Sequence, residues 1–223
     1  MLFLDGMSII ALFMLIMLAQ PQPVSLSLQD TNSLVESLQR KYDRLSTLST
    51  DFVQIYSAPG ERTRRETGKL LLKKPGKMRW DYSTPEAKLF LSDGRNIFEY
   101  VPSEAMATKV SVKESDDLRA PFMFLLGRGN LRRDFRRIEA SNEAPAQTGN
   151  LVLKLTPKRT SMFQELFVEV QPDNLKIARL TIIESGGARS DFIFSNLEEN
   201  PPLNDDRFTF RPPAGVRIVL VDN

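Results

Sequence analysis

The hydrophobic period of the chain changes near residue 50, from a helical pattern to an alternating one. Before this point apolar residues recur at helical spacing with charged residues between them, at Leu34, Leu38, Leu45 and Leu48. The polar residues 30–33 supply side chains that cap a helix. We therefore predict one amphipathic helix, whose apolar stripe covers the core of a sheet.

From Thr50 onward, polar and apolar residues alternate in short runs that are separated by tight turns. Pro75-Gly76, Pro85 and Asp93-Gly94 mark three of these turns. The pattern is typical of an antiparallel meander. After the alternation at 52–56, strands are predicted at 67–73, 77–82, 88–92, 96–101, 107–113, 136–140, 151–156, 165–170, 177–184 and 190–197. The paired prolines of the tail, 206–219, favour an extended edge segment.

Several predicted strands are apolar at consecutive positions, so both faces of the sheet should be covered; examples are 70–72, 89–91 and 166–168. The segment 120–129 interrupts the strands and predicts a short helix that Pro121 opens and Gly127 closes. Helices on the concave side of one curved sheet would supply cover, and 14 Phe with 8 Met supply bulky linings. Composition alone leaves a filled core and a ligand cavity equally open.

The first residues read as a targeting segment. The apolar run from Ser8 to Leu18 is shorter than the roughly 20 residues that a spanning helix needs, and AQPQP follows it. We expect a signal peptide at 1–19, a linker at 20–29 and a single domain at 30–223. An uncleaved anchor is the alternative, because no Lys or Arg precedes Arg40 and no small-x-small cleavage pattern precedes Gln20.

Composition removes many kinds of chemistry. The 223 residues contain no Cys and no His, which excludes disulfides, thiolate metal sites and the commonest general base. The formal net charge of +2 gives little attraction to nucleic acid. We expect no cofactor, no metal and no nucleic acid partner. A secreted hydrolase with paired carboxylates is an alternative, for which Asp81, Asp93 and Asp191 are available.

One stretch carries an ordered signature. Residues 68–100, GKLLLKKPGKMRWDYSTPEAKLFLSDGRNIFEY, run from a Gly through an apolar strand, two basic residues and a Pro to a strand with Trp80. A further Pro, an apolar strand, Asp93-Gly94 and a strand ending in Tyr100 follow. This order resembles the LolA family of outer-membrane lipoprotein carrier proteins. Three other segments resemble family elements in the right order: LSTDFVQ at 48–54, PFMFLLGRG at 121–129 and FTFRPPAGV at 208–216.

The resemblance implies a mainly β (α+β) fold, an incomplete antiparallel β-barrel with a helical lid. It implies a non-enzymatic monomeric carrier in the periplasm. The carrier would take triacylated lipoproteins from an inner-membrane ABC transporter to an outer-membrane acceptor. A lipid-sensing or lipoprotein-sensing binding module of the same fold, or a carrier of other lipids, is the alternative.

The resemblance to the family also indicates candidate site residues. In the family the basic residue before the signature Pro is usually Arg and is tied to lid closure; here it is Lys74, which offers a single compact charge instead of a planar fork. The arginines at 128, 132, 133, 136 and 137 could contact anionic headgroups or an acidic transporter surface. A one-residue error in register would reverse the predicted lining. The candidates for the acyl-chain cavity are Leu70, Leu72, Met78, Trp80, Leu89, Leu91, Phe98 and Tyr100 on the sheet and Phe122, Phe124 and Leu125 on the lid.

Overall fold

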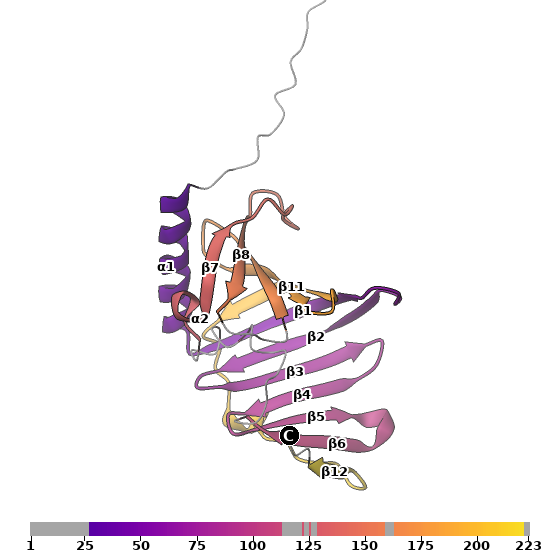
Figure 1. The fold of residues 1–223 in the computed structure, drawn as a ribbon. Coiled ribbons are helices and arrows are strands. Elements are labelled where there is room, and N and C mark those ends of the chain that lie inside the picture. Colours follow the sequence, from indigo (N-terminus) through magenta and orange to yellow (C-terminus); the bar gives the residue numbers. More distant parts are fainter. Residues whose placement is uncertain (1–26, 113–121, 123–124, 126–128, 159–162, 221–223) are drawn as a thin grey trace, which may run out of the picture.

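The computed structural model describes residues 27–112, 122, 125, 129–158 and 163–220 (Figure 1). These residues form one curved, open sheet of twelve strands in the order β12-β6-β5-β4-β3-β2-β1-β11-β10-β9-β8-β7. The mainly β expectation is confirmed. The strands are β1 Thr47–Ser57, β2 Arg64–Lys73, β3 Lys77–Thr84, β4 Lys88–Asp93, β5 Asn96–Val101, β6 Met106–Ser111, β7 Phe135–Ala140, β8 Leu151–Pro157, β9 Phe163–Val170, β10 Ile177–Glu184, β11 Arg189–Glu199 and β12 Arg217–Leu220.

Two meanders make up the sheet. Strands β1 to β6 follow one another along it, as do β7 to β11, and the two halves join where β1 pairs with β11. Asp51 of β1 lies opposite Ser195 of β11. The predicted antiparallel meander is confirmed for these eleven strands. The tail differs, because β12 pairs in parallel with the edge strand β6.

Helix α1, Leu28–Arg44, begins and ends earlier than predicted. Ser27 is its N-cap: the Asp30 amide donates to the Ser27 hydroxyl at 3.1 Å, and the Ser27 amide donates to the Asp30 carboxylate at 3.3 Å. The helix therefore starts inside the predicted linker. Leu48 was expected on the helical stripe, but it belongs to β1, because the chain is already extended at the C-cap residue Leu45.

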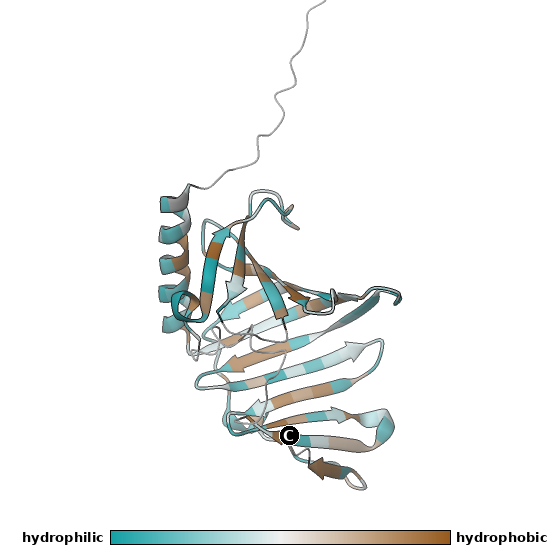
Figure 2. Cartoon of the chain, in the orientation of Figure 1, coloured by the Kyte–Doolittle hydropathy of each residue, from teal (hydrophilic) through white to brown (hydrophobic). Residues whose placement is uncertain are grey.

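One side of α1 is buried against the sheet. Val35, Leu38 and Tyr42 recur at helical spacing and join the main hydrophobic core, which includes Leu70 of β2. Figure 2 shows apolar colour on the side of α1 that faces the strands and polar colour on the other. We call the face of the sheet that contacts α1 the inner face, and the opposite one the outer face.

The inner face is concave. Strands β3 and β11 are separated by β2 and β1, so they lie about 14 Å apart along the sheet at the usual spacing of neighbouring strands. The ring centroids of Trp80 on β3 and Phe192 on β11 are nevertheless only 5.3 Å apart. Side chains of distant strands can converge in this way only where the sheet curves around them.

The outer face is covered by other segments of the chain. The short helix η3, Asp205–Phe208, lies over β3 and β4, and Phe208 is buried there. Asp205 forms ion pairs of 2.7 and 2.9 Å with Lys73 and Lys77. Since Leu71 on this face is as buried as its inner neighbours Leu70 and Leu72, the expectation that both faces are covered is confirmed.

A charged network holds the loop 141–150 to the outer face of the other meander. Glu169 of β9 is 1% exposed, and its carboxylate accepts hydrogen bonds from the amides of Ala146 and Gln147 at 2.8 and 3.1 Å. Arg179 of β10 approaches the same carboxylate at 2.9 Å. A buried carboxylate is stable only with such donors and a counter-charge, so this network is structural.

Two sequence predictions concern residues that the structure does not describe. The signal peptide at 1–19 lies outside the described residues, and so does most of the predicted helix at 121–127. Within the part of the chain that the structure describes, no helix has both the length and the apolar character needed to cross a membrane.

Candidate functional site

Aromatic rings gather on the inner face around Trp80. The ring of Phe52 on β1 lies edge-on to Trp80, with centroids 4.8 Å apart, and that of Tyr82 lies 4.9 Å from Phe52. Phe122 lies 5.0 Å from Trp80 and 5.2 Å from Phe192 of β11. Side chains from three strands and from the segment 120–129 thus form one contiguous aromatic surface.

A glycine makes room for this cluster. Gly68 of β2 lies opposite Phe52 on one side and Tyr82 on the other. A Cβ atom at Gly68 would lie 2.8 Å from the ring of Phe52 and 2.1 Å from the backbone oxygen of Asp81. The missing side chain therefore lets the Phe52 ring lie over β2, which brings it to Trp80.

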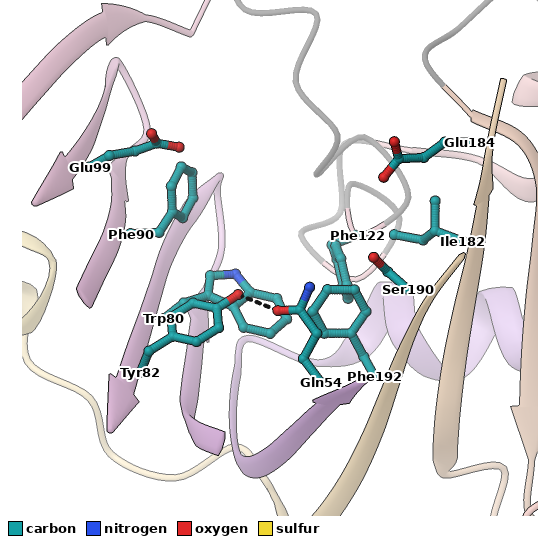
Figure 3. Close-up of a pocket in the computed structure, with 10 residues that line it drawn as sticks. All are labelled: Gln54, Trp80, Tyr82, Phe90, Glu99, Phe122, Ile182, Glu184, Ser190 and Phe192. Carbon is teal, nitrogen blue, oxygen red and sulfur yellow. Dashed lines mark hydrogen bonds between the residues drawn. The ribbon is translucent and has the colours of Figure 1, made fainter. Parts of the chain in front are cut away.

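A cavity of about 180 Å³ opens next to the aromatic cluster (Figure 3). Pockets for drug-sized ligands usually measure about 300–1,000 Å³, so this one has room for only part of a long acyl chain. Tyr82 donates a hydrogen bond to the Gln54 side chain across its floor at 2.8 Å. The lining residues are Gln54, Trp80, Tyr82, Phe90, Glu99, Phe122, Ile182, Glu184, Ser190 and Phe192.

The cavity lining combines apolar side chains with several polar ones. Among the described residues that line it, Glu99 and Glu184 are the only charged ones, and none is Lys or Arg. The indole Nε1 of Trp80 is fully buried and has no hydrogen-bond partner among the described residues. The cavity can therefore surround apolar groups, and the buried Trp80 indole is a donor at its edge that no described residue uses.

Six of the predicted lining residues come together on the inner face. The pairing of Leu70 with Trp80 and of Leu72 with Met78 places these four on the same side of β2 and β3. All are buried in the main core. The same core contains Phe122 and Leu125 of the segment 120–129. Phe124 lies outside the described residues.

Four other candidates lie on the outer face, so the side of the sheet predicted for them is wrong. Phe90, and not its neighbours in the strand, pairs with Trp80, which turns Leu89 and Leu91 outward. Phe98 and Tyr100 pair with Leu91 and Leu89 and share their face. Their rings lie 5.0 and 5.8 Å from that of Phe210 in the C-terminal tail. They hold the tail and do not line the cavity.

Sequence reasoning missed several lining residues. Gln54, Phe90, Ile182 and Phe192 all lie in strands that the sequence predicts, but none was assigned to the cavity. Phe90 stands between two leucines, so alternation could not choose among the three. The positions of Gln54 and Phe192 follow from the pairing of β1 with β11, where these two residues lie opposite each other. That pairing joins distant parts of the chain and has no local signal.

Lys74 contacts helix α1 in the structure. Its ammonium donates to the backbone oxygens of Tyr42, and of Asp43 at 3.1 Å, in the last turn of the helix. Cations are favourable at this end, where the last carbonyls lack helical partners. Burial lowers the pKa of Lys74 below its usual value, and the nearby Asp43 partly offsets this effect. The structure thus gives Lys74 a role in capping α1; contacts with most of the predicted lid lie outside the described residues.

Three of the five candidate arginines are engaged in local pairs, and Arg128 lies outside the described residues. Arg132 forms an ion pair with Glu36 of α1 at 2.9 Å, Arg133 pairs with Asp134, and Arg137 pairs with Glu139. All three arginines are half exposed or more. They therefore remain accessible to an acidic or anionic partner.

The acidic residues considered for a hydrolase do not share a cleft. Asp81 accepts from Arg79 at 2.7 Å on the outer face, and Asp191 accepts from Arg189 at 2.7 Å on a different strand of that face. Asp93 accepts from the backbone amides of Arg95 and Asn96 in the turn between β4 and β5. Each carboxylate has a structural partner of its own, so the geometry gives no support to paired acid and base chemistry.

Sequence relatives agree with the resemblance seen in the signature segment. Residues 43–211 match the family described as outer membrane lipoprotein carrier protein LolA. A relative from Aeromonas salmonicida is 25% identical over 183 residues, covering 82% of this chain and 86% of its own. One from Chromobacterium violaceum is 28% identical over 191 residues, covering 85% and 89%. Both relatives are named outer-membrane lipoprotein carrier protein.

One solved structure shares the fold at low sequence identity, and a second is reported beside it. An uncharacterized conserved protein from Thermus thermophilus superposes with a TM-score of 0.55 at 8% identity, covering 85% of this chain and 99% of that one. A LolA superfamily protein from Nitrosomonas europaea gives a TM-score of 0.46 at 16% identity, with coverage of 81% and 97%. Because the family match spans most of the sequence, the chain belongs to the LolA family of outer membrane lipoprotein carrier proteins.

Proposed function

We propose that this protein carries lipoproteins by shielding their acyl chains against the inner face of its open sheet. One observation carries the proposal: the aromatic cluster around Trp80 borders an apolar cavity on the concave side of the sheet. The family and the names of the relatives support the same role, that of a carrier and not a catalyst. The cargo is therefore a lipoprotein.

The energetics explain why such a carrier is needed. Moving one methylene from water to an apolar site is worth about 0.8 kcal/mol, so several long acyl chains together are worth tens of kcal/mol. A lipid anchor of that size does not leave a membrane and cross water alone. An aromatic and aliphatic surface without directional polar contacts can accept the chains and still release them.

Cargo binding requires the cavity to enlarge. Its volume of about 180 Å³ is below that of most pockets for small ligands. Phe122 packs against both Trp80 and Phe192, whose rings also contact each other, so it covers the point where the two halves of the inner face meet (Figure 3). Displacement of Phe122 by an acyl chain would join the cavity to the apolar surface beneath it.

The route of the cargo follows the family resemblance. The protein would act in the periplasm as a monomer, as a single domain at 30–223 after removal of residues 1–19. It would receive triacylated lipoproteins from an inner-membrane ABC transporter and pass them to an acceptor at the outer membrane. The exposed arginines at 132, 133 and 137 are candidates for contact with one of these partners.

Release from membranes tests the proposal. The purified protein is mixed with detergent-free membranes that hold a labelled triacylated lipoprotein and the ATP-driven transporter. We expect ATP to release the label as a soluble one-to-one complex. The variant Phe90→Ala, on the inner face, should lower the yield of this complex, whereas Phe98→Ala, at the same level of the neighbouring strand but on the outer face, should not.

Two outcomes contradict the proposal. Absence of any ATP-dependent complex with folded protein would exclude a carrier in this pathway. If the same protein still bound the lipid anchor, the result would favour a lipid sensor or a carrier of other lipids. An equal loss in both variants, with both folded, would show that cargo does not use the inner face.

A further inference from the structure

The cavity contains a hydrogen-bond donor that the protein itself does not use. Trp80 is 2% exposed, and its indole Nε1 has no acceptor among the described residues. Most buried donors in proteins are paired, because an unpaired one loses its bond to water without replacement. An unpaired donor that borders a cavity therefore points to an acceptor supplied by a ligand.

The surroundings of the indole explain why the protein supplies no acceptor. Its neighbours Phe52, Phe122 and Phe192 are hydrocarbon rings. The side-chain oxygen of Gln54 accepts the hydroxyl proton of Tyr82. Figure 3 shows the indole nitrogen turned toward the space between Phe90 and Phe122. Because Nε1 is itself fully buried, a ligand atom can accept from it only when the neighbouring rings move apart, as the enlargement of the cavity by cargo requires.

The charges of the lining restrict what that atom can be. The charged lining residues are Glu99 and Glu184, and none of the ten is basic. The nearby ammonium of Lys88 is paired with Glu66 at 2.6 Å and lies over the Tyr82 ring. Among the described residues, nothing in the lining would supply a counter-charge to a carboxylate or phosphate at the indole, and burying such a group unpaired is costly. An uncharged carbonyl oxygen has no such cost.

We infer that the Trp80 indole donates a hydrogen bond to the carbonyl oxygen of an ester or amide that links an acyl chain to its parent molecule. The site thus selects uncharged acyl linkages over the carboxylate of a free fatty acid or a phosphate group at the same position beside the indole. This inference rests on the proposed acyl-binding function and adds the class of chemical group that the cavity recognises. It also makes Trp80 a specificity residue and not only part of an apolar wall.

The single tryptophan of the chain allows a direct test. Protein labelled with ¹⁵N at the indole gives one Nε1–H signal in NMR spectra. Three probes of similar length are added in turn: methyl palmitate, palmitate and heptadecane. We expect methyl palmitate to move the indole proton downfield, as hydrogen bonding does, and heptadecane to bind without that shift. Palmitate should bind about tenfold or more weakly than its ester. Leaving its carboxylate without a counter-charge costs at least as much as a shift of one pKa unit, which is a factor of about ten.

Two variants separate hydrogen bonding from packing. Trp80→Phe should weaken the binding of methyl palmitate by about threefold to tenfold more than it weakens the binding of heptadecane. This is the usual range for the loss of one net hydrogen bond. Glu184→Gln removes one of the two lining carboxylates, so it should raise the affinity for palmitate relative to that for methyl palmitate. Equal indole shifts with ester and hydrocarbon, or palmitate binding as tight as the ester, would overturn the inference. If none of the three probes binds the folded protein, the acyl-binding function itself fails.

Discussion

Gly68 is the position where the smallest change should have a large effect. Replacing it with Ala adds one methyl group to β2, and that carbon would lie 2.1 Å from the backbone oxygen of Asp81 and 2.8 Å from the Phe52 ring. The oxygen belongs to the neighbouring strand β3, so it cannot move away without breaking strand pairing. The ring of Phe52 would have to leave its place against Trp80.

The expected cost follows from these contacts. Overpacking of a dense core usually costs about 1–3 kcal/mol, and a clash with backbone belongs at the upper end of that range. We therefore expect Gly68→Ala to lower the free energy of unfolding by about 3 kcal/mol. For a chain of this size the melting temperature should fall by roughly 6–12 °C.

Urea unfolding followed by Trp80 fluorescence measures this effect, because the indole lies 4.8 Å from the Phe52 ring. Gly186→Ala is the matched control, since no atom lies within 4 Å of the added Cβ and the residue sits in the turn between β10 and β11. The control should stay within about 0.5 kcal/mol of the unmodified protein. Equal stability of the two variants would refute the account of how the aromatic cluster is packed.

Two further predictions concern the attachment of α1 and of the tail. Tyr42→Phe removes the hydroxyl that accepts the buried Ile177 amide at 3.0 Å, so the midpoint of urea unfolding should fall by an amount equivalent to about 1–3 kcal/mol; an unchanged midpoint would contradict this role. Hydrogen bonds from Lys73 and Lys77 lower the pKa of Asp205 to about 2, so their stabilising effect should be complete above pH 4 and disappear as the pH falls through 2. Asp205→Asn should therefore speed trypsin cleavage near Arg207 at pH 7, and an unchanged rate would show that these ion pairs do not hold the tail.

The sequence predicts the strands of this fold well, because each strand alternates or is apolar over a short run between turns. The predicted strand 77–82 lies within β3, and 177–184 coincides with β10. Such local patterns depend only on the spacing of side chains along an extended chain. They also indicate that both faces are covered, since Leu70, Leu71 and Leu72 are all buried.

The sequence does not show which face of the sheet each side chain points toward when consecutive residues are all apolar. In 89–91 all three residues are large and apolar, so only the pairing of Phe90 with Trp80 shows which side chain points inward. That pairing depends on the turn at Pro85, where one residue more or less would turn each side chain of the strand to the opposite face of the sheet. The partner of Lys74 at the end of α1 lies about thirty positions away and has no local pattern. The start of α1 could have been found, because Ser27 and Asp30 have the spacing of a capping box.

The junction of β1 with β11 sets the order in which the sheet can be completed. β1 is the first strand made, but its partner on that side ends at Glu199, near the end of the chain. Its neighbour β2 is available almost at once, so the first meander can form while the other edge of β1 stays unpaired. Exposed strand edges recruit other strands, and long-range pairing is slow. A chain truncated before β11 should therefore keep the edge of β1 unpaired and be prone to aggregation. Pairing with β11 thus protects the complete protein from association through this edge.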